Sequence, residues 1–205
     1  LHVASGADFG WREGGEKWPA HYADSLPPVA ELGPASPAGL FSGNLTHFPK
    51  RYRNAVFVLD WTFGAIHAVH LTAKGASYAS EPELFLSGAN LPVTDAVIAK
   101  DGSLYFITGG RGVPSSLYRV RHKNPNSISR EKPTGNHLRD QRLRLETFHQ
   151  APPSGIALRE AWSRLGSPDR FVRHAARIAL ERQPVADWQD LFVKETGIRA
   201  VINAA

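Results

Sequence analysis

The chain has 205 residues, of which 42% are hydrophobic and 21% charged, a composition that excludes an intrinsically disordered protein. It contains no cysteine, which excludes disulfide bonds, thiolate zinc sites and covalently attached c-type haem within these residues. No apolar run approaches the roughly 18 residues that a membrane helix needs, so we expect no membrane span. The sequence starts at Leu1, lacks methionine and shows no signal peptide, and we interpret it as an internal piece of a longer protein.

The chain divides into two regions of different composition. Its net charge is +5, and most of that excess lies in residues 124–205, where 13 basic residues stand against nine acidic ones. Residues 124–136 are polar and lack any periodicity, which is typical of a linker. We therefore predict one domain over residues 1–123 and another over residues 137–205.

The first region has the pattern of β-structure. Runs rich in β-branched and aromatic residues occupy residues 55–61, 65–71, 103–108 and 117–121. Turn signals follow or separate these runs, and they are Gly64, Lys74-Gly75, Asp101-Gly102 and the glycine-rich residues 109–112. We expect short antiparallel strands throughout residues 1–123.

The strand pairs also repeat. Gly64 and Gly112 lie 48 positions apart, and blades of β-propellers repeat about every 40 to 50 residues. Because equivalent turns of successive blades emerge on one face, we expect the turns at residues 61–64 and 109–112 to be neighbours. Two blades cannot close a ring, so the pattern predicts a fragment of a propeller.

The second region has helical periodicity. Leu158, Ala161, Trp162 and Leu165 follow the i, i+3, i+4, i+7 spacing of a buried stripe. Residues 167–169, Ser-Pro-Asp, predict the start of a further helix capped by Ser167, with apolar positions at residues 171, 172, 175, 178 and 179. Pro184 ends that helix, and residues 188–192 mark another. Short helices separated by glycine and proline are typical of HEAT-like repeats.

Several motifs resemble the glucose/sorbosone dehydrogenase-like propellers, a group of soluble quinoproteins. Residues 5–12, Ser-Gly-Ala-Asp-Phe-Gly-Trp-Arg, are similar to a signature near the active face of that group. Residues 60–64 and 94–106 look like its last blades. Residues 167–181 resemble the helices that follow the propeller in a bacterial group carrying HEAT-like repeats and, farther on, a c-type haem domain. The resemblance spans nearly the whole chain.

The resemblance implies a cofactor face and an extracytoplasmic, periplasmic protein. In the sugar-oxidising relatives, residues at the positions of Phe9 and Trp11 contact pyrroloquinoline quinone. The candidate cofactor-binding residues are Phe9, Trp11, Arg12, Trp61, Thr62 and Arg111. The family's general base and main calcium ligands would lie before Leu1, so no catalytic residue is assigned here.

Two departures weaken the match to the quinone site. Arg12 stands where the relatives carry proline, and Thr62, Phe63 and His67 stand where they carry cations that pair with the cofactor's carboxylates. We assign no metal site, because His67 and His70 lie three apart in a strand and face opposite sides of it.

Three functions remain compatible with the sequence. The first is a quinone-dependent sugar or alcohol dehydrogenase that passes electrons to a haem domain outside these residues. The second is a non-catalytic propeller that binds carbohydrate or protein, with the helices as a scaffold, and the missing cations favour it. Nucleic-acid binding by the basic second region is disfavoured, since aromatic residues do not interleave with its basic ones. We expect the dehydrogenase-like propeller.

Overall fold

The computed structural model describes residues 1–10, 18–110, 112–124 and 135–205, and the chain forms two compact units. One unit, called here the sheet unit, comprises Ala30–Thr72 and Ala79–Pro133. The other, called the helical unit, comprises Leu1–Val29, Ala73–Tyr78 and Thr134–Ala205.

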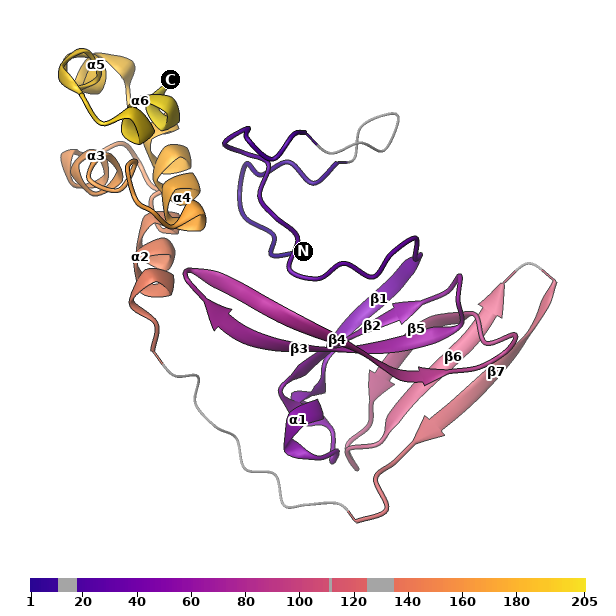
Figure 1. Cartoon of the computed structure of the whole chain (residues 1–205). Helices are drawn as coiled ribbons and strands as arrows, with labels where there is room; N and C mark the ends of the chain where they lie inside the picture. The colour runs from indigo at the N-terminus through magenta and orange to yellow at the C-terminus, as the bar shows by residue number, and fades with distance from the viewer. Residues whose placement is uncertain (11–17, 111, 125–134) are drawn as a thin grey trace. The chain divides into compact units, whose positions relative to one another are not determined.

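The sheet unit contains two antiparallel sheets (Figure 1). The first sheet has the order β1-β2-β3-β4 and the second the order β5-β6-β7, so consecutive strands are neighbours in both. The strands are β1 (Pro37–Ser42), β2 (Ala55–Asp60), β3 (Ala65–Lys74), β4 (Ser77–Ser87), β5 (Val93–Ile98), β6 (Leu104–Gly110) and β7 (Val113–Val120). A 3-10 turn (Gly43–Leu45) and the short helix α1 (Lys50–Arg53) join β1 to β2.

Alternation along the strands builds one apolar core between these sheets. Phe57 of β2 pairs with Ala68 of β3, and both are fully buried. Phe106 of β6 and Leu104 supply the facing side of the same cluster. The strands predicted within residues 55–61, 65–71, 103–108 and 117–121 are confirmed.

The second sheet carries exposed apolar side chains on the face that points away from the core. Its outer face displays Val97, Ile107 and Leu117, which are 64%, 44% and 67% exposed. Asp95, Ile107 and Leu117 lie opposite one another across the three strands, so they share one face, while Phe106 lies on the core face. Such a face is unusual for a solvated sheet, because antiparallel sheets commonly alternate apolar and polar residues between core and water.

The helical unit is built around α4 (Arg170–Glu181). Val172, Ala176 and Ala179 of α4 are completely buried. The other helices are α2 (His137–Glu146), α3 (Gly155–Trp162), α5 (Val185–Lys194) and α6 (Ile198–Ala204). The apolar stripe predicted for residues 171–179 is confirmed as the buried face of this helix.

The start of α4 differs from the prediction. Its N-cap is Asp169, whose Oδ1 accepts hydrogen bonds from the backbone N–H groups of Phe171 and Val172, both at 3.0 Å. The Ser167 hydroxyl accepts instead from the Asp169 N–H, at 3.2 Å. The expectation that Ser167 caps the helix is wrong, because the carboxylate lies close enough to two free N–H groups and carries the charge that a helix N-terminus favours.

Residues 1–29 pack in the helical unit, although the sequence pattern grouped them with the strands. No strand occurs in the described residues 1–10 and 18–36, and β1 begins at Pro37. Side chains of α4 satisfy the backbone of this segment instead. His174 Nε2 lies 2.7 Å from the Ser5 carbonyl, and Arg170 donates to the carbonyls of Tyr22 and Ser25 at 2.6 and 3.0 Å.

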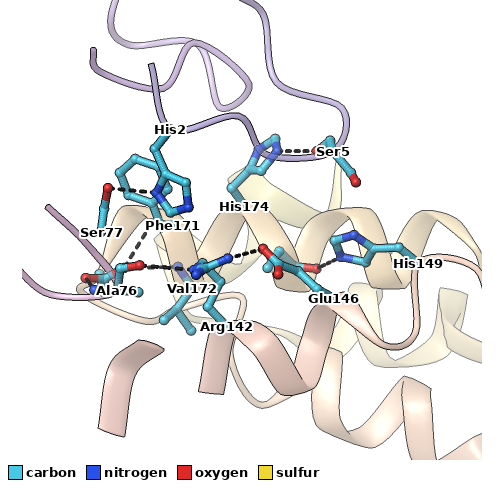
Figure 2. A network of polar contacts seen from close by, with 12 residues as sticks. His2, Ser5, Ala76, Ser77, Arg142, Glu146, His149, Phe171, Val172 and His174 are labelled. Carbon is cyan, nitrogen blue, oxygen red and sulfur yellow. Dashed lines mark hydrogen bonds and ion pairs between the residues drawn. The ribbon is translucent and has the colours of Figure 1, made fainter. Parts of the chain in front are cut away.

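The turn between β3 and β4, Ala73–Tyr78, also belongs to the helical unit (Figure 2). The Ala76 N–H donates to Asp169 Oδ2 at 2.9 Å, and Arg142 Nε donates to the Ala76 carbonyl at 3.0 Å. Asn136 Nδ2 donates to the Gly75 carbonyl at 2.9 Å. Gly75 has φ +56°, and a Cβ there would lie 2.1 Å from Asp169 Oδ2. Glycine is therefore required at this turn on two grounds, its backbone angle and the nearby carboxylate.

No helix in the described part of the chain is both long and apolar enough to cross a membrane.

Asp169 both caps α4 and accepts the N–H of Ala76, and its replacement tests how much these two roles stabilise the chain. Asp169→Ala removes the cap of α4 and the acceptor for Ala76, and we expect it to lower the unfolding free energy of the chain by about 2–4 kcal/mol. Asp169→Asn should cost about 1 kcal/mol, because either orientation of the amide leaves one set of N–H donors facing another donor. Urea denaturation with Asp190→Asn, an exposed site on α5, is the charge-matched control. Equal losses in Asp169→Asn and Asp190→Asn would contradict this assignment.

The helical unit should lose stability as the pH falls below about 6.5. Burial lowers the pKa of His174, the hydrogen bond to the Ser5 carbonyl opposes this shift without cancelling it, and the charge of Arg177 adds to the lowering. Burial likewise lowers the pKa of His2. Below the ordinary histidine pKa the unfolded chain takes up protons that the folded chain resists, so the stability present at pH 7 is lost progressively on acidification.

We expect the midpoint of thermal unfolding to drop between pH 7.5 and about 5.5 in the wild type, and the drop to shrink in His174→Gln. His137→Gln, on the exposed start of α2, should leave the pH slope unchanged. A slope that persists in the double variant of His2 and His174 would show that other groups carry the effect.

Candidate functional site

The turn between β2 and β3 is held in shape by one buried carboxylate. Asp60 is 1% exposed, and its Oδ1 accepts backbone N–H groups from Ser36 at 3.2 Å, Thr62 at 3.0 Å and Phe63 at 3.4 Å. An aspartate that accepts from residues two and three positions ahead is the standard Asx arrangement of a tight turn. The positions of Trp61, Thr62 and Phe63 thus follow from a residue inside the core.

Trp61 links this turn to the end of β6. Its indole Nε1 donates to the Gly109 carbonyl at 2.8 Å. A Cβ at Gly110 would lie 2.9 Å from Trp61 Cζ2, so the ring rests directly on glycine backbone. The expectation that the turns at residues 61–64 and 109–112 are neighbours is confirmed for their described residues. We call these two turns the paired turns.

The paired turns present aromatic surface. Trp61 is 41% and Phe63 59% exposed, and Thr62 between them is exposed as well. An exposed ring beside a hydroxyl offers a flat apolar surface with a nearby hydrogen-bonding group. Such a surface suits a ligand with one apolar and one polar aspect, such as a sugar ring or a planar heterocycle.

The other candidate residues lie elsewhere or outside the described part of the chain. Trp11, Arg12 and Arg111 fall outside the described residues. Phe9 is half-buried in the helical unit, whereas Trp61 and Thr62 belong to the sheet unit. Of the three candidates that the structure describes, the sequence neighbours Trp61 and Thr62 lie together in one turn.

The segment around Phe9 is organised by Asp8, which is 6% exposed. Its carboxylate accepts the N–H of Gly10 at 3.4 Å and that of Trp18 at 3.1 Å. The Asp8 N–H in turn donates to the Asp24 carbonyl at 2.9 Å. Asp8 therefore holds Gly10 and Trp18 close together through one carboxylate.

A cluster of titratable side chains that the sequence did not indicate lies on the sheet unit. Glu83 of β4 contacts His70 Nε2 at 2.7 Å, the Tyr52 hydroxyl at 2.9 Å and Arg51 Nη2 at 2.6 Å. The hydrogen bond to His70, followed by that to Tyr52, lowers the pKa of Glu83. The hydrogen bond to Glu83 raises the pKa of Tyr52.

This cluster fixes α1 against β3 and β4. Its carboxylate is held ionised and is shared among three donors, so its hydrogen-bonding capacity is used within the fold. Glu83 lies 13 positions from His70 and 31 and 32 positions from Tyr52 and Arg51, so no local pattern connects the carboxylate to its partners.

His67 and His70 confirm the expected alternation. His70 pairs with Ala55 and shares the face of Phe57, whereas His67 pairs with Val58 on the other face. Within the described ranges, no three His, Cys, Asp or Glu side chains gather in a group that could hold a metal ion.

Variants at the paired turns should reveal how Trp61 is held. Trp61→Phe removes the N–H that donates to Gly109 and part of the ring surface that rests on Gly110, and it should cost at least about 1 kcal/mol of unfolding free energy. Gly110→Ala should destabilise the wild type, because the new methyl group meets the indole, but it should be nearly neutral in a Trp61→Ala background. Denaturant unfolding of the four proteins in this cycle measures the coupling. Additive losses would contradict the contact.

Comparison of the chain with models of known protein families, with curated proteins and with solved structures found no match.

Proposed function

We propose that the chain forms two blades of a glucose/sorbosone dehydrogenase-like β-propeller, followed by the start of HEAT-like helical repeats. The observation that carries the proposal is the hydrogen bond between Trp61 and Gly109, which joins equivalent turns of two successive antiparallel sheets. In a propeller, such turns line a common face where ligands bind.

The arrangement of the sheets supports the architecture. Four consecutive strands in a meander are the topology of one blade, and β1 to β4 have this order. The second sheet packs one face against the first through Leu104 and Phe106. Its outer face remains apolar at Val97, Ile107 and Leu117, which suits a sheet stacked between two others.

The proposed activity is the oxidation of a sugar or another small alcohol in the periplasm or another extracytoplasmic compartment. A bound quinone would supply the redox chemistry, and a haem domain elsewhere in the protein would accept the electrons. The part of this chain is to position the substrate, for which Trp61, Thr62 and Phe63 offer ring surface and a hydroxyl.

The described residues do not fit the complete cofactor. The carboxylates of pyrroloquinoline quinone require cationic partners, and residues 61–67 contain neither lysine nor arginine. Among the described residues, no cluster of three or more carboxylate side chains is arranged to bind calcium. The proposal for this chain therefore concerns the binding of the substrate and not of the quinone.

The exposed rings of the paired turns also favour a second function. Exposed aromatic rings without adjacent cations are well suited to hold a carbohydrate with no redox step. A non-catalytic propeller that binds carbohydrate or protein, with the helical repeats as its scaffold, would use the paired turns in this way.

Calorimetric titration with a panel of aldoses and small alcohols tests the binding face. We expect Phe63→Ala to weaken sugar binding about threefold to tenfold, since an aromatic contact contributes about 0.5–1.5 kcal/mol. Val193→Ala, an exposed apolar site on α5, should leave affinity unchanged. If no sugar or alcohol binds, or if both variants behave alike, the proposed face is wrong.

Dye reduction in the presence of pyrroloquinoline quinone and calcium then separates the two functions. Reduction that depends on the bound sugar would support the dehydrogenase. Sugar binding without reduction would support the non-catalytic propeller.

A further inference from the structure

A pocket of about 170 Å³ in the helical unit is lined by cationic side chains. Arg170 and Arg173 come from the first turn of α4, and Arg199 comes from α6. His21 of the N-terminal segment, with Asn203, completes the polar part of the lining. Among the described residues, no carboxylate lines this pocket.

The three arginines carry their charge without a close carboxylate partner. None of the ion pairs recorded for the described residues includes Arg170, Arg173 or Arg199. Asp169 is nearest in sequence, but its two oxygens already accept three backbone N–H groups. Burial, followed by the charges of Arg199 and Arg170, lowers the pKa of Arg173, and the carboxylate of Asp169 opposes this shift without cancelling it.

The backbone holds two of these guanidinium groups in fixed orientations. Arg170 donates to the Tyr22 and Ser25 carbonyls, and Arg173 donates to the carbonyls of Ser167 and Pro168 at 2.6 and 3.0 Å. In each arginine both hydrogen bonds come from the same terminal nitrogen, so the other terminal nitrogen still has N–H groups to donate.

We propose that this pocket binds a phosphate group, either as the free ion or as the phosphoryl group of a small molecule. Guanidinium groups match the oxygens of phosphate in paired hydrogen bonds, and several arginines converging from different segments are typical of phosphate recognition. A dianion would relieve the mutual repulsion of three fixed positive charges. The site is independent of the paired turns and of the proposed function.

Arg199 is the best residue to substitute in a binding test, because its side chain is exposed and forms no recorded hydrogen bond or ion pair that would stabilise the fold. Arg199→Gln should weaken the binding of inorganic phosphate about tenfold, the expected loss for a hydrogen bond to a charged group. Arg199→Lys should fall between Arg199→Gln and the wild type, because an ammonium keeps the charge but not the paired donors. Arg177→Gln, on α4 outside this pocket, removes the same charge and should bind as the wild type does.

Calorimetry of the full 205-residue chain measures the affinity for inorganic phosphate, and thermal unfolding measures the accompanying stabilisation. Glucose 6-phosphate, with glucose as its control, distinguishes the two sources of the group: tighter binding than inorganic phosphate indicates a phosphorylated small molecule, and equal binding indicates the ion. Equal stabilisation by chloride or acetate at the same ionic strength would overturn the proposal. So would an unchanged affinity in Arg199→Gln.

Discussion

The carboxylate of Asp169 connects two distant parts of the chain. One oxygen caps α4, the helix on which the core of the helical unit is built, and the other holds the N–H of Ala76, 93 positions earlier. Most helix caps are local and could be replaced by serine or asparagine at small cost. Here the cap also holds the β3–β4 turn, which α2 contacts as well through Arg142 and the capping residue Asn136.

Side chains of the same helix, α4, donate hydrogen bonds to backbone carbonyls of the N-terminal segment. His174 bonds the carbonyl of Ser5, and Arg170 bonds those of Tyr22 and Ser25. A segment without secondary structure has backbone carbonyls that must find partners once they are buried. In the helical unit these partners are long polar side chains of α4, which explains how an irregular stretch rich in glycine and proline packs against it.

The fold was predictable where the signal is local. The runs of β-prone residues at 55–61 and 65–71 and the apolar stripe at residues 171–179 predicted strands and a helix, and the structure contains these elements. Strand β4 was not predicted, because Glu81 and Glu83 interrupt its alternation and Pro82 lies within it. The assignment of residues 1–29 also differs, since it depends on side chains more than 140 positions away. The adjacency of Trp61 and Gly109 followed from a repeat, whereas the Glu83 cluster and the arginine pocket join residues that no spacing relates.

The contacts of the β3–β4 turn also constrain the order in which the chain can fold. Gly75 and Ala76 bond partners that lie 61, 66 and 93 residues later in the chain. During synthesis the hairpin emerges first, and its turn remains hydrated until α2 and α4 have been made. A hairpin tip is commonly where a protein tolerates insertion and proteolytic cleavage. In this protein the tip belongs to the helical unit and Ala76 is buried, so an inserted residue would displace the backbone groups that Arg142 and Asp169 bond.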